Sequence, residues 1–289
     1  MSAQHSTPDH APGFKAIRWN NDWITRPLFG IALAALAIFA LTRDTPVYFA
    51  LLMALMALPA AHEWHRMVAR KNAFRLETAV TAASVALAVL SLAFGASVAV
   101  ALVLVALGGI AAVLLAVRQG NAPGWEGLGV VYLGLPSVAL VSLRVFPPEG
   151  AMIIIGLFVI VWATDTGALV CGNLIGGPRL SPRLSPGKTW AGTLGGSLIA
   201  AAAFAGFVYT LHGAPQAAFV LGLALSVTAH AGDLFESFLK RRFGIKDSGA
   251  IIPGHGGVLD RMDSTLAAAL ALALLVFAFH LDPLFGAHA

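Results

Sequence analysis

Long apolar runs separated by short polar breaks fill most of this chain of 289 residues. A helix that crosses the hydrocarbon core of a bilayer needs about 20 mainly apolar residues. Scanning the chain for such runs predicts about nine transmembrane helices. Their expected ranges are 27–42, 46–62, 77–94, 96–117, 128–147, 150–174, 192–211, 215–236 and 264–284. The pattern therefore predicts an all-α fold, a polytopic integral membrane helix bundle.

The polar breaks also predict how the chain is organised. Residues 1–26 are expected to form a separate polar segment, and 27–289 a single membrane domain. Within that domain, 27–149 is a series of apolar helices with short links, whereas 150–289 contains two longer loops rich in Gly, Pro and cations. A cleavable signal peptide is the alternative for the first apolar run. The polar segment before it is long and further apolar runs follow, so we expect a retained helix.

Composition agrees with a bilayer environment. Hydrophobic residues make up 58% of the chain and charged residues 11%, against about 45–50% and about 25% in soluble domains. Cys171 is the only cysteine, so neither a disulfide framework nor a thiolate zinc site is expected. Glycines at helical spacing, such as Gly192, Gly195 and Gly196, are expected to let helices pack closely.

The 18 lysines and arginines are distributed unevenly between the predicted loops. With the N-terminus in the cytoplasm, all of them except Arg43 and Arg144 fall on the cytoplasmic side. This positive-inside bias supports the number of helices and predicts a cytoplasmic N-terminus. The net charge of +4 then reflects membrane topology. We therefore expect the lipid bilayer as a partner and no nucleic acid.

Asp165 lies well inside the apolar run 150–174. A charged side chain at bilayer depth costs about 2.5–3.5 kcal/mol on insertion scales, so such a residue is expected to face protein or a water-filled cavity. Asp165 is therefore a candidate functional residue. The alternative is a structural hydrogen bond between helices, made with Thr164 or Thr166.

The stretch HAGDLFESFLKRR ends the apolar run 215–236. Asp233, either Glu236 or Ser237, and Lys240 recur every three or four residues, so they share one face of a helix. Ordinary ion pairing at a solvated helix end would explain the cations 240–242. It does not explain Asp233, which lies toward the apolar side. His230, one turn earlier, is expected to pack rather than to orient a carboxylate.

The stretch LDRMDS opens the last apolar run and places Asp260 and Asp263 on one helix face. Capping of a helix N-terminus accounts for one of these carboxylates. Together with Asp233, they predict an oxygen-only site for a hard divalent cation such as Mg²⁺. No cysteine cluster or suitable histidine pair indicates a softer metal.

Two loops carry residues suited to binding phosphate. In PGHGG, residues 253–257, glycines around His255 would let backbone amides approach an anion. A simple turn would explain this stretch alone, but Lys246, Arg261 and the aspartates lie beside it in the sequence. In the loop 175–191, the positive-inside bias explains the arginines. The remaining cation and hydroxyls of that loop are candidate phosphate ligands, namely Ser185, Lys188 and Thr189.

The stretch HEWH, residues 62–65, resembles a zinc-protease helix only superficially. That motif needs two histidines four residues apart, whereas His62 and His65 are three apart. We therefore interpret Glu63 and its neighbours as an ordinary helix end. Trp64 and Trp125 lie near ends of the predicted helices and are expected at the membrane interface.

Carboxylates for a divalent cation, cations and glycine amides for phosphates, and a cytoplasmic membrane surface together predict phosphoryl or nucleotidyl transfer. Residues 237–263, SFLKRRFGIKDSGAIIPGHGGVLDRMD, resemble the signature of the phosphatidate cytidylyltransferases, also called CDP-diacylglycerol synthases. GDLFES, DTGA and SPGKTW are also similar to that family, so the resemblance covers 162–264. One departure is that this chain has Gly187 and Ala191 where the family usually has a lysine and a glutamate.

The resemblance implies a Mg²⁺-dependent reaction of CTP with phosphatidate that gives CDP-diacylglycerol and pyrophosphate, carried out by the helices and loops of 150–289. It implies metal ligands at Asp233, Asp260 and Asp263, with Asp165 a further candidate. It implies a catalytic set of Lys188, Lys246, Asp247, His255 and Arg261. It implies substrate-binding residues at Ser185, Thr189, Lys240, Arg241, Gly256 and Gly257. It further implies a bacterial inner membrane location, and a homodimer is one of the oligomeric states left open.

Two other functions are alternatives for these residues. A CTP-dependent polyprenol or phytol kinase would share helices and cations but would transfer the γ-phosphate. An ion-coupled transporter would use Asp165 and Asp233 to bind the coupling ion, and such proteins often carry repeats with broken helices in both halves. The long signature in 237–263 favours the cytidylyltransferase, and the polar residues crowd one half and one face.

Overall fold

A computed structural model gives the structure of residues 22–69, 75–249 and 256–279. Within these ranges the chain forms nine α-helices and one two-stranded antiparallel sheet. The helices are α1 (Asp22–Leu41), α2 (Val47–Ala69), α3 (Leu76–Ala93), α4 (Val98–Gln119), α5 (Pro123–Val145), α6 (Gly150–Ile175), α7 (Trp190–Thr210), α8 (Pro215–Arg242) and α9 (Leu259–Phe279). The strands β1 (Arg179–Ser181) and β2 (Ser185–Thr189) form a hairpin between α6 and α7.

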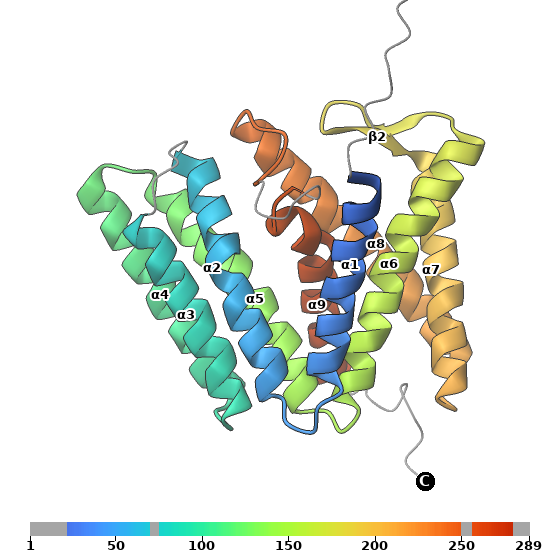
Figure 1. The fold of residues 1–289 in the computed structure, drawn as a ribbon, viewed down its shortest axis with the longest axis horizontal. Coiled ribbons are helices and arrows are strands. Elements are labelled where there is room, and N and C mark those ends of the chain that lie inside the picture. The colour runs from blue at the N-terminus through green and yellow to red at the C-terminus, as the bar shows by residue number, and fades with distance from the viewer. Residues whose placement is uncertain (1–21, 70–74, 250–255, 280–289) are drawn as a thin grey trace, which may run out of the picture.

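The helices run alternately up and down, with the hairpin at one end of the bundle (Figure 1). Helices α2 to α5 lie on one side and α6 to α8 on the other, with α9 between them (Figure 1). Contacts of α9 with α2 and with α5 join the two sides. The series of apolar helices and the polar C-terminal half are therefore packed against each other at α9.

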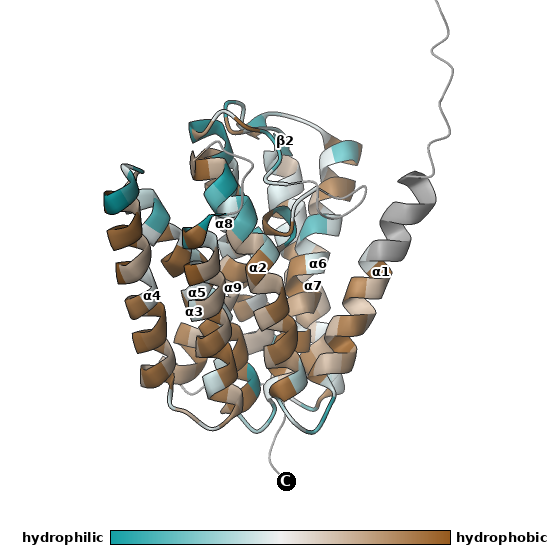
Figure 2. Ribbon diagram, turned by 60° about the vertical axis from the view of Figure 1, so that its left-hand side comes forward, coloured by the Kyte–Doolittle hydropathy of each residue, from teal (hydrophilic) through white to brown (hydrophobic). Residues whose placement is uncertain are grey.

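Eight of the described helices, α2 to α9, are long and apolar enough to cross a membrane. In α1 the apolar part found among the described residues, Gly30–Leu41, is shorter. Hydrophobic residues fill the middle of the bundle and hydrophilic residues gather at the hairpin end (Figure 2). The prediction of an all-α polytopic membrane protein is confirmed.

Helix ends differ from the apolar runs where polar residues continue the helix. Helix α2 extends to Ala69, α8 extends to Arg242, and α9 already begins at Leu259. Hydropathy marks where the lipid contact ends, whereas the backbone hydrogen bonds of a helix continue as long as the side chains allow them. The long charged side chains at the end of α8 can extend to the membrane surface.

The hairpin was not predicted, because 175–191 was expected to be a loop. Arg179 pairs with Thr189 and Ser181 with Ser185, and the Arg179 side chain donates to the Gly187 carbonyl oxygen at 3.1 Å. β1 has only three residues, and β2 contains Pro and Gly, so neither strand shows a sustained alternation of apolar and polar residues. The sequence pattern therefore could not reveal them.

The two basic residues predicted on the far side of the membrane lie together. Arg144 donates from Nε to the Leu41 carbonyl oxygen at 3.1 Å and from Nη2 to that of Arg43 at 2.6 Å. This contact lies at the end of the bundle opposite the hairpin, where α1 and α5 end. Lys15, Arg18, Arg70 and Lys71 lie outside the described residues, and the orientation of the bundle in the membrane stays a prediction.

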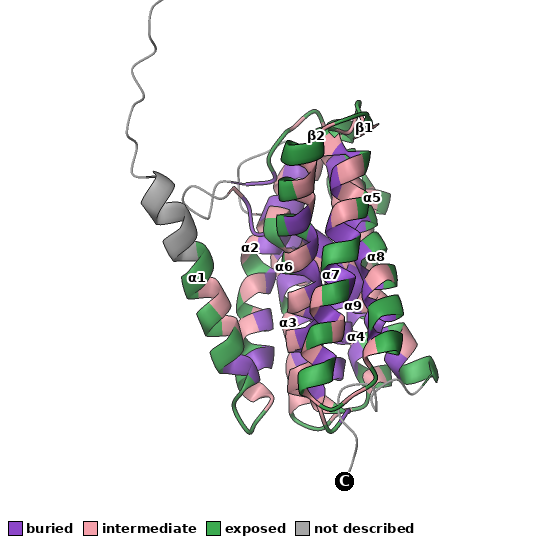
Figure 3. Cartoon of the chain, turned by 90° about the vertical axis from the view of Figure 1, so that its right-hand side faces the viewer, coloured by how far each residue is buried: buried purple, intermediate pink, exposed green. Residues whose placement is uncertain are grey.

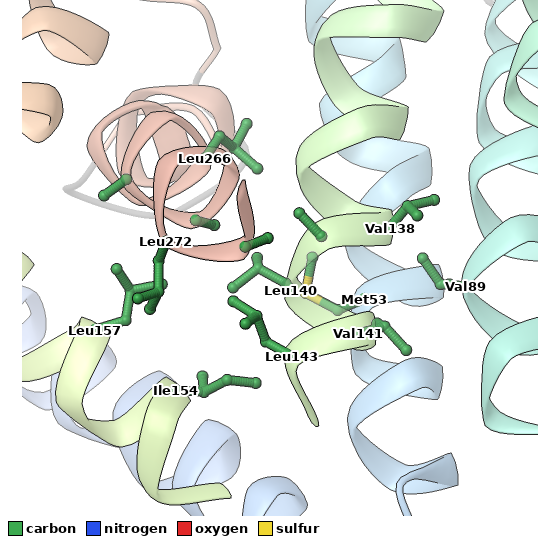
Figure 4. Packing of buried hydrophobic residues seen from close by; sticks show 14 of the residues in the cluster. Met53, Val89, Val138, Leu140, Val141, Leu143, Ile154, Leu157, Leu266 and Leu272 are labelled. Atoms are coloured by element: carbon green, nitrogen blue, oxygen red, sulfur yellow. The ribbon is translucent and has the colours of Figure 1, made fainter. Parts of the chain in front are cut away.

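The buried core runs through the bundle, and one part of it lies where α5, α6 and α9 meet. Leu140 and Leu143 of α5 point toward Leu272 of α9 and toward Ile154 and Leu157 of α6 (Figure 4). Buried residues line the inner faces of the helices while exposed ones face outward (Figure 3). Because many of the outward residues are large and apolar, the outer surface suits contact with lipid chains.

Glycines bring α6 and α7 close together, as the sequence predicted. A Cβ atom at Gly196 would lie 2.7 Å from the Thr164 carbonyl oxygen and 2.7 Å from the Ala168 nitrogen. A Cβ atom at Gly192 would lie 2.7 Å from the Ala168 carbonyl oxygen. No pair of described helices packs more extensively than α6 with α7.

Candidate active site

A polar cavity opens among α6, α7, α8 and β2. Its volume is about 350 Å³, and its lining includes Asp165, Lys188, Asp233 and His230. Lys188, at the end of β2, forms an ion pair with Asp233 of α8. The hairpin therefore brings a cation onto the carboxylate that the sequence placed on the apolar side of α8.

Asp165 reaches this cavity from the interior of α6. It lies ten residues before the end of the helix, which corresponds to about 15 Å at 1.5 Å per residue. The interhelical hydrogen bond considered as an alternative role is made by its neighbour, because Thr164 Oγ1 donates to Ser226 Oγ at 2.7 Å. Asp165 is within electrostatic range of Asp233 and Lys188. The prediction that Asp165 faces a cavity is confirmed.

Asp260 lies in the first turn of α9 and is fully engaged by protein donors. Its Oδ1 atom lies 2.7 Å from Lys240 Nζ of α8. Its Oδ2 atom accepts hydrogen bonds from the backbone nitrogens of Gly257 at 2.9 Å and Ser248 at 3.1 Å. Lys240 also lies 3.7 Å from Glu236 Oε2, so one lysine neutralises carboxylates of both helices.

Asp263 is buried one turn further into α9, against Glu236 of α8. Its Oδ1 atom accepts a hydrogen bond from the Ser264 nitrogen at 2.7 Å. Both carboxylate oxygens of Glu236 are buried and accept no hydrogen bond from the described residues. Two carboxyl groups in contact away from water need a shared proton or a cation between them.

The metal site predicted from the sequence is not a preformed cage. Across the described ranges, no group of three or more His, Cys, Asp or Glu side chains is placed to hold a metal ion. Asp233 and Asp260 are instead paired with Lys188 and Lys240. Mg²⁺ often uses one or two protein carboxylates together with water and substrate phosphates. The all-oxygen donors fit that mode, as do the Glu236 oxygens, which accept no hydrogen bond from the described residues. The metal roles stay predictions.

Several predicted substrate ligands have structural roles in the hairpin and its surroundings. Thr189 is buried, and its Oγ1 atom caps α7 by accepting from the Gly192 nitrogen at 3.0 Å. Arg241 is exposed and donates to the carbonyl oxygens of Leu184 at 3.4 Å and Ile245 at 3.2 Å. Ser185 is half-buried in β2. Thr189 nevertheless lines the polar cavity.

The signature loop is only partly described. Lys246 and Asp247 are exposed, and no hydrogen bond or ion pair of theirs is found among the described residues. Gly256 has φ of 85°, the left-handed region that favours glycine. The backbone amide of Gly257 donates its hydrogen bond to Asp260 and is therefore not available to a bound anion. His255 lies outside the described residues, so its predicted role stays a prediction.

A second, apolar cavity of about 510 Å³ lies between α1, α2, α6 and α9. Met53, Met56 and Trp162 contribute to its apolar lining, and Arg261 lies at the α9 end. Trp162 and Asp165 are three residues apart and lie on the same side of α6. The apolar cavity borders the earlier turns of this helix and the polar cavity borders the later ones.

A set of buried polar residues in α2 was not predicted from the sequence. Glu63 is fully buried and accepts hydrogen bonds from the Val258 nitrogen at 3.0 Å and the Leu259 nitrogen at 2.9 Å. Its interpretation as an ordinary helix end is wrong, because α2 continues for six more residues. Trp64 is also fully buried and donates to the Trp125 carbonyl oxygen at 3.0 Å, so its expected interfacial position is wrong.

His65, the next residue of α2, belongs to a separate buried network. It contacts Glu126 of α5 and lies 2.8 Å from Thr81 Oγ1 of α3. Arg75 donates to Glu126 Oε1 at 2.6 Å. The signal available in the sequence was the presence of Glu63, His65 and Glu126 beside apolar runs, where an ionisable residue needs a partner.

His230 combines packing with exposure to the polar cavity. It is 5% exposed, which agrees with the expectation that it packs. Its Nε2 atom is buried and has no hydrogen-bond partner among the described residues. Because His230 also lines the polar cavity, it is a further candidate for contact with a bound substrate.

Comparison with known proteins shows which family the chain resembles. The model of the cytidylyltransferase family matches residues 24–279. A phosphatidate cytidylyltransferase from Brucella suis is 47% identical over 166 residues, which are 56% of this chain and 60% of the relative. One from Rickettsia bellii is 39% identical over 155 residues, 49% of this chain and 64% of the relative. One from Haemophilus influenzae is 41% identical over 128 residues, 42% of this chain and 44% of the relative.

The similarity to these curated relatives therefore spans less than two thirds of their length. The family match covers nearly the whole bundle, including both groups of helices, the hairpin and all of α9. The chain belongs to the cytidylyltransferase family.

Proposed function

We propose that this protein transfers CMP from CTP to phosphatidate and releases pyrophosphate, so that CDP-diacylglycerol forms at the cytoplasmic face of a membrane. The family match and the names of the relatives support this reaction. The proposal includes phospholipid biosynthesis in the bacterial inner membrane. A homodimer has no support among the contacts of this single chain and stays a prediction.

The observation that carries the proposal is that two unlike cavities border α6 at different positions along its length. The polar cavity offers Lys188 to phosphate groups and lies beside aspartates. The apolar cavity lies among membrane helices and has Arg261 at its α9 end. A nucleotide is polar and matches the first cavity, whereas the chains of a lipid with a phosphate headgroup are apolar and match the second. We assign the polar cavity to CTP and the apolar cavity to the acyl chains of phosphatidate.

In this mechanism an oxygen of the phosphatidate phosphate attacks the α-phosphorus of CTP. The bond from the α-phosphorus to the bridging oxygen of the β-phosphate breaks, and pyrophosphate leaves with that oxygen. The attacking phosphate is already ionised, so the site needs no strong general base. Lys188 and Arg261 stabilise the negative charge that is shared over the phosphates in the transition state.

Carboxylates at the start of α9 and the end of α8 are the proposed ligands of Mg²⁺. Asp233, Asp260 and Asp263 would hold it, with Asp165 and Glu236 close by, and the remaining ligands would be phosphate oxygens and water. When bound, the ion would neutralise phosphate charge during transfer. For Asp233 and Asp260 this requires that Lys188 and Lys240 turn from the carboxylates to the phosphates.

The other predicted residues keep their roles as proposals. Lys246, Asp247 and His255 would act in the signature loop around the transferred group. Substrate contacts are proposed for Ser185, Thr189, Lys240, Arg241, Gly256 and Gly257. Among these, Thr189 already has a structural role as a helix cap, so its substitution would also affect folding.

Labelled CTP separates this function from its rivals. Detergent-purified protein is incubated with phosphatidate, Mg²⁺ and CTP labelled at either the α- or the γ-phosphate. The proposed reaction puts the α-label into lipid and the γ-label into pyrophosphate. A polyprenol or phytol kinase would put the γ-label into its lipid and release CDP. A transporter would leave CTP unchanged, and either result would refute the proposal.

A further inference from the structure

Glu63 connects α2 to the start of α9. Its Oε1 atom accepts from the Val258 nitrogen at 3.0 Å, and its Oε2 atom accepts from the Leu259 nitrogen at 2.9 Å. The first backbone N–H groups of a helix have no partner within the helix and are usually satisfied by a Ser, Thr, Asp or Asn side chain just before it. Val258 occupies that place here and has no polar side chain. Glu63, from another helix, supplies the cap.

Ser248 links this cap to Asp260. Its hydroxyl donates to Glu63 Oε2 at 3.2 Å, and its backbone nitrogen donates to Asp260 Oδ2 at 3.1 Å. Its carbonyl oxygen accepts from Arg66 Nη2 at 2.6 Å. Glu63 and Arg66, one turn apart on α2, therefore hold the same short segment that donates to the Asp260 carboxylate.

Two glycines allow this close approach. A Cβ atom at Gly249 would lie 2.6 Å from Glu63 Cδ, and one at Gly257 would lie 2.5 Å from Glu63 Oε2. Both glycines belong to the stretch 237–263 that resembles the family signature. The Gly257 amide donates to Asp260, so the backbone that surrounds Glu63 is the same backbone that orients Asp260.

We propose that Glu63 is a positioning residue for the transfer reaction, acting through the α9 amides and Ser248 on Asp260. The inference rests on the proposed function, because its effect is read in cytidylyl transfer. It gives the N-terminal helices a part in the chemistry that the sequence had placed entirely in 150–289. A displacement of about 1 Å at a reacting group can lower a rate by roughly a hundredfold, so a fixed start of α9 matters.

The test is Glu63→Gln, which keeps the shape of the side chain. The amide group replaces one accepting oxygen with an NH₂ group that faces backbone donors. We expect kcat to fall by about tenfold or more, equivalent to about 1.4 kcal/mol. KM for CTP should stay within about threefold of the wild-type value, because Lys188 and Asp233 lie on elements that Glu63 does not contact. A residue with a merely structural role would leave kcat per folded molecule unchanged.

Glu126→Gln is the matched control. Glu126 is also fully buried, but its partners are His65 and Arg75 and not the start of α9. We expect its kcat within about threefold of wild type even if its thermal midpoint falls as far as that of Glu63→Gln. An equal loss of kcat in both variants would mean general loosening of the bundle and would overturn the inference.

Ser248→Ala keeps the test decisive if Glu63→Gln does not fold. It removes only the hydroxyl link to Glu63 and leaves the backbone donor to Asp260 in place. We expect a loss in kcat of about threefold or more with KM for CTP unchanged. Wild-type kcat in Ser248→Ala, or a loss below about threefold in folded Glu63→Gln, contradicts the inference. Lack of CDP-diacylglycerol synthesis by the wild-type protein would instead contradict the proposed function.

Discussion

At the scale of single residues, lysines form ion pairs with two of the carboxylates that the sequence analysis assigned to a metal ion. Lys188 pairs with Asp233, and Lys240 bridges Asp260 and Glu236. The first pair joins the hairpin to α8, and the contact of Lys240 with Asp260 joins α8 to α9. In the proposed reaction, these lysines would turn from the carboxylates to the phosphates of the nucleotide. The pairs therefore keep the carboxylates and the cations in place before substrate binds.

Replacing Lys188 tests its assignment to the polar cavity. Lys188→Met keeps the length of the side chain but removes the charge that would meet the phosphates of CTP. Loss of one electrostatic group of this kind typically lowers kcat by about 10²–10³, and we expect a loss in this range. Transfer of the α-label from saturating CTP to lipid measures it.

Arg183→Met is the control for that variant. Arg183 is an exposed cation of the same hairpin, between β1 and β2, and the positive-inside bias accounts for its presence. Its kcat should stay within about threefold of wild type. If the Lys188→Met variant retains more than about a tenth of wild-type activity, Lys188 does not have the proposed role in the reaction.

At the scale of elements, the sequence predicted where helices cross the membrane better than where they end. Long apolar runs specify spans because the bilayer imposes a minimum length. The ends of α2 and α8 are polar, so hydropathy could not follow the helix there. The same limit hid Glu63, whose role depends on a contact with α9 from nearly 200 residues away. Sequence spacing does reveal neighbours on one helix, and it correctly grouped Asp233, Glu236 and Lys240 on one face of α8.

Packing of α6 against α7 gives a prediction about stability. Gly196→Ala places a Cβ atom against backbone atoms of α6, which cannot move aside as a side chain could. Overpacking of this kind costs about 1–3 kcal/mol, so the thermal midpoint in detergent should fall. The measurement is the thermal unfolding of purified protein, monitored as the loss of the monodisperse species on heating.

Gly206→Ala is the comparison within the same helix. No atom lies within 4 Å of a Cβ built at Gly206, so the substitution gains the higher helix propensity of alanine, up to about 1 kcal/mol, without a clash. Its midpoint should equal or exceed that of wild type. A midpoint for Gly196→Ala as high as that of Gly206→Ala would show that α6 and α7 can separate without cost.

At the scale of the whole molecule, the fold places two chemically different cavities along α6. The sequence predicted that Asp165 faces protein or a cavity, because it is a charged residue in an apolar run, and it predicted Lys188 separately as a phosphate ligand in a loop. It could not predict the apolar cavity, since residues such as Met53 and Met56 look like any others that face lipid or core. Its existence depends on how far α1 lies from α2 and α9, which is a property of the assembled bundle.

The apolar cavity can be tested by filling it from α1. Ala34 lines the cavity, whereas its neighbour Ala35 is exposed and is not among the lining residues. Ala34→Phe should displace acyl methylenes, each worth about 0.8 kcal/mol of burial, so loss of two raises KM for long-chain phosphatidate roughly tenfold. Dihexanoyl phosphatidate, with little chain to bury, should show a much smaller change, and KM for CTP should not change. Ala35→Phe should leave all three KM values unaltered. If Ala34→Phe raised KM equally for long and short chains, the cavity would not be where the lipid chains bind.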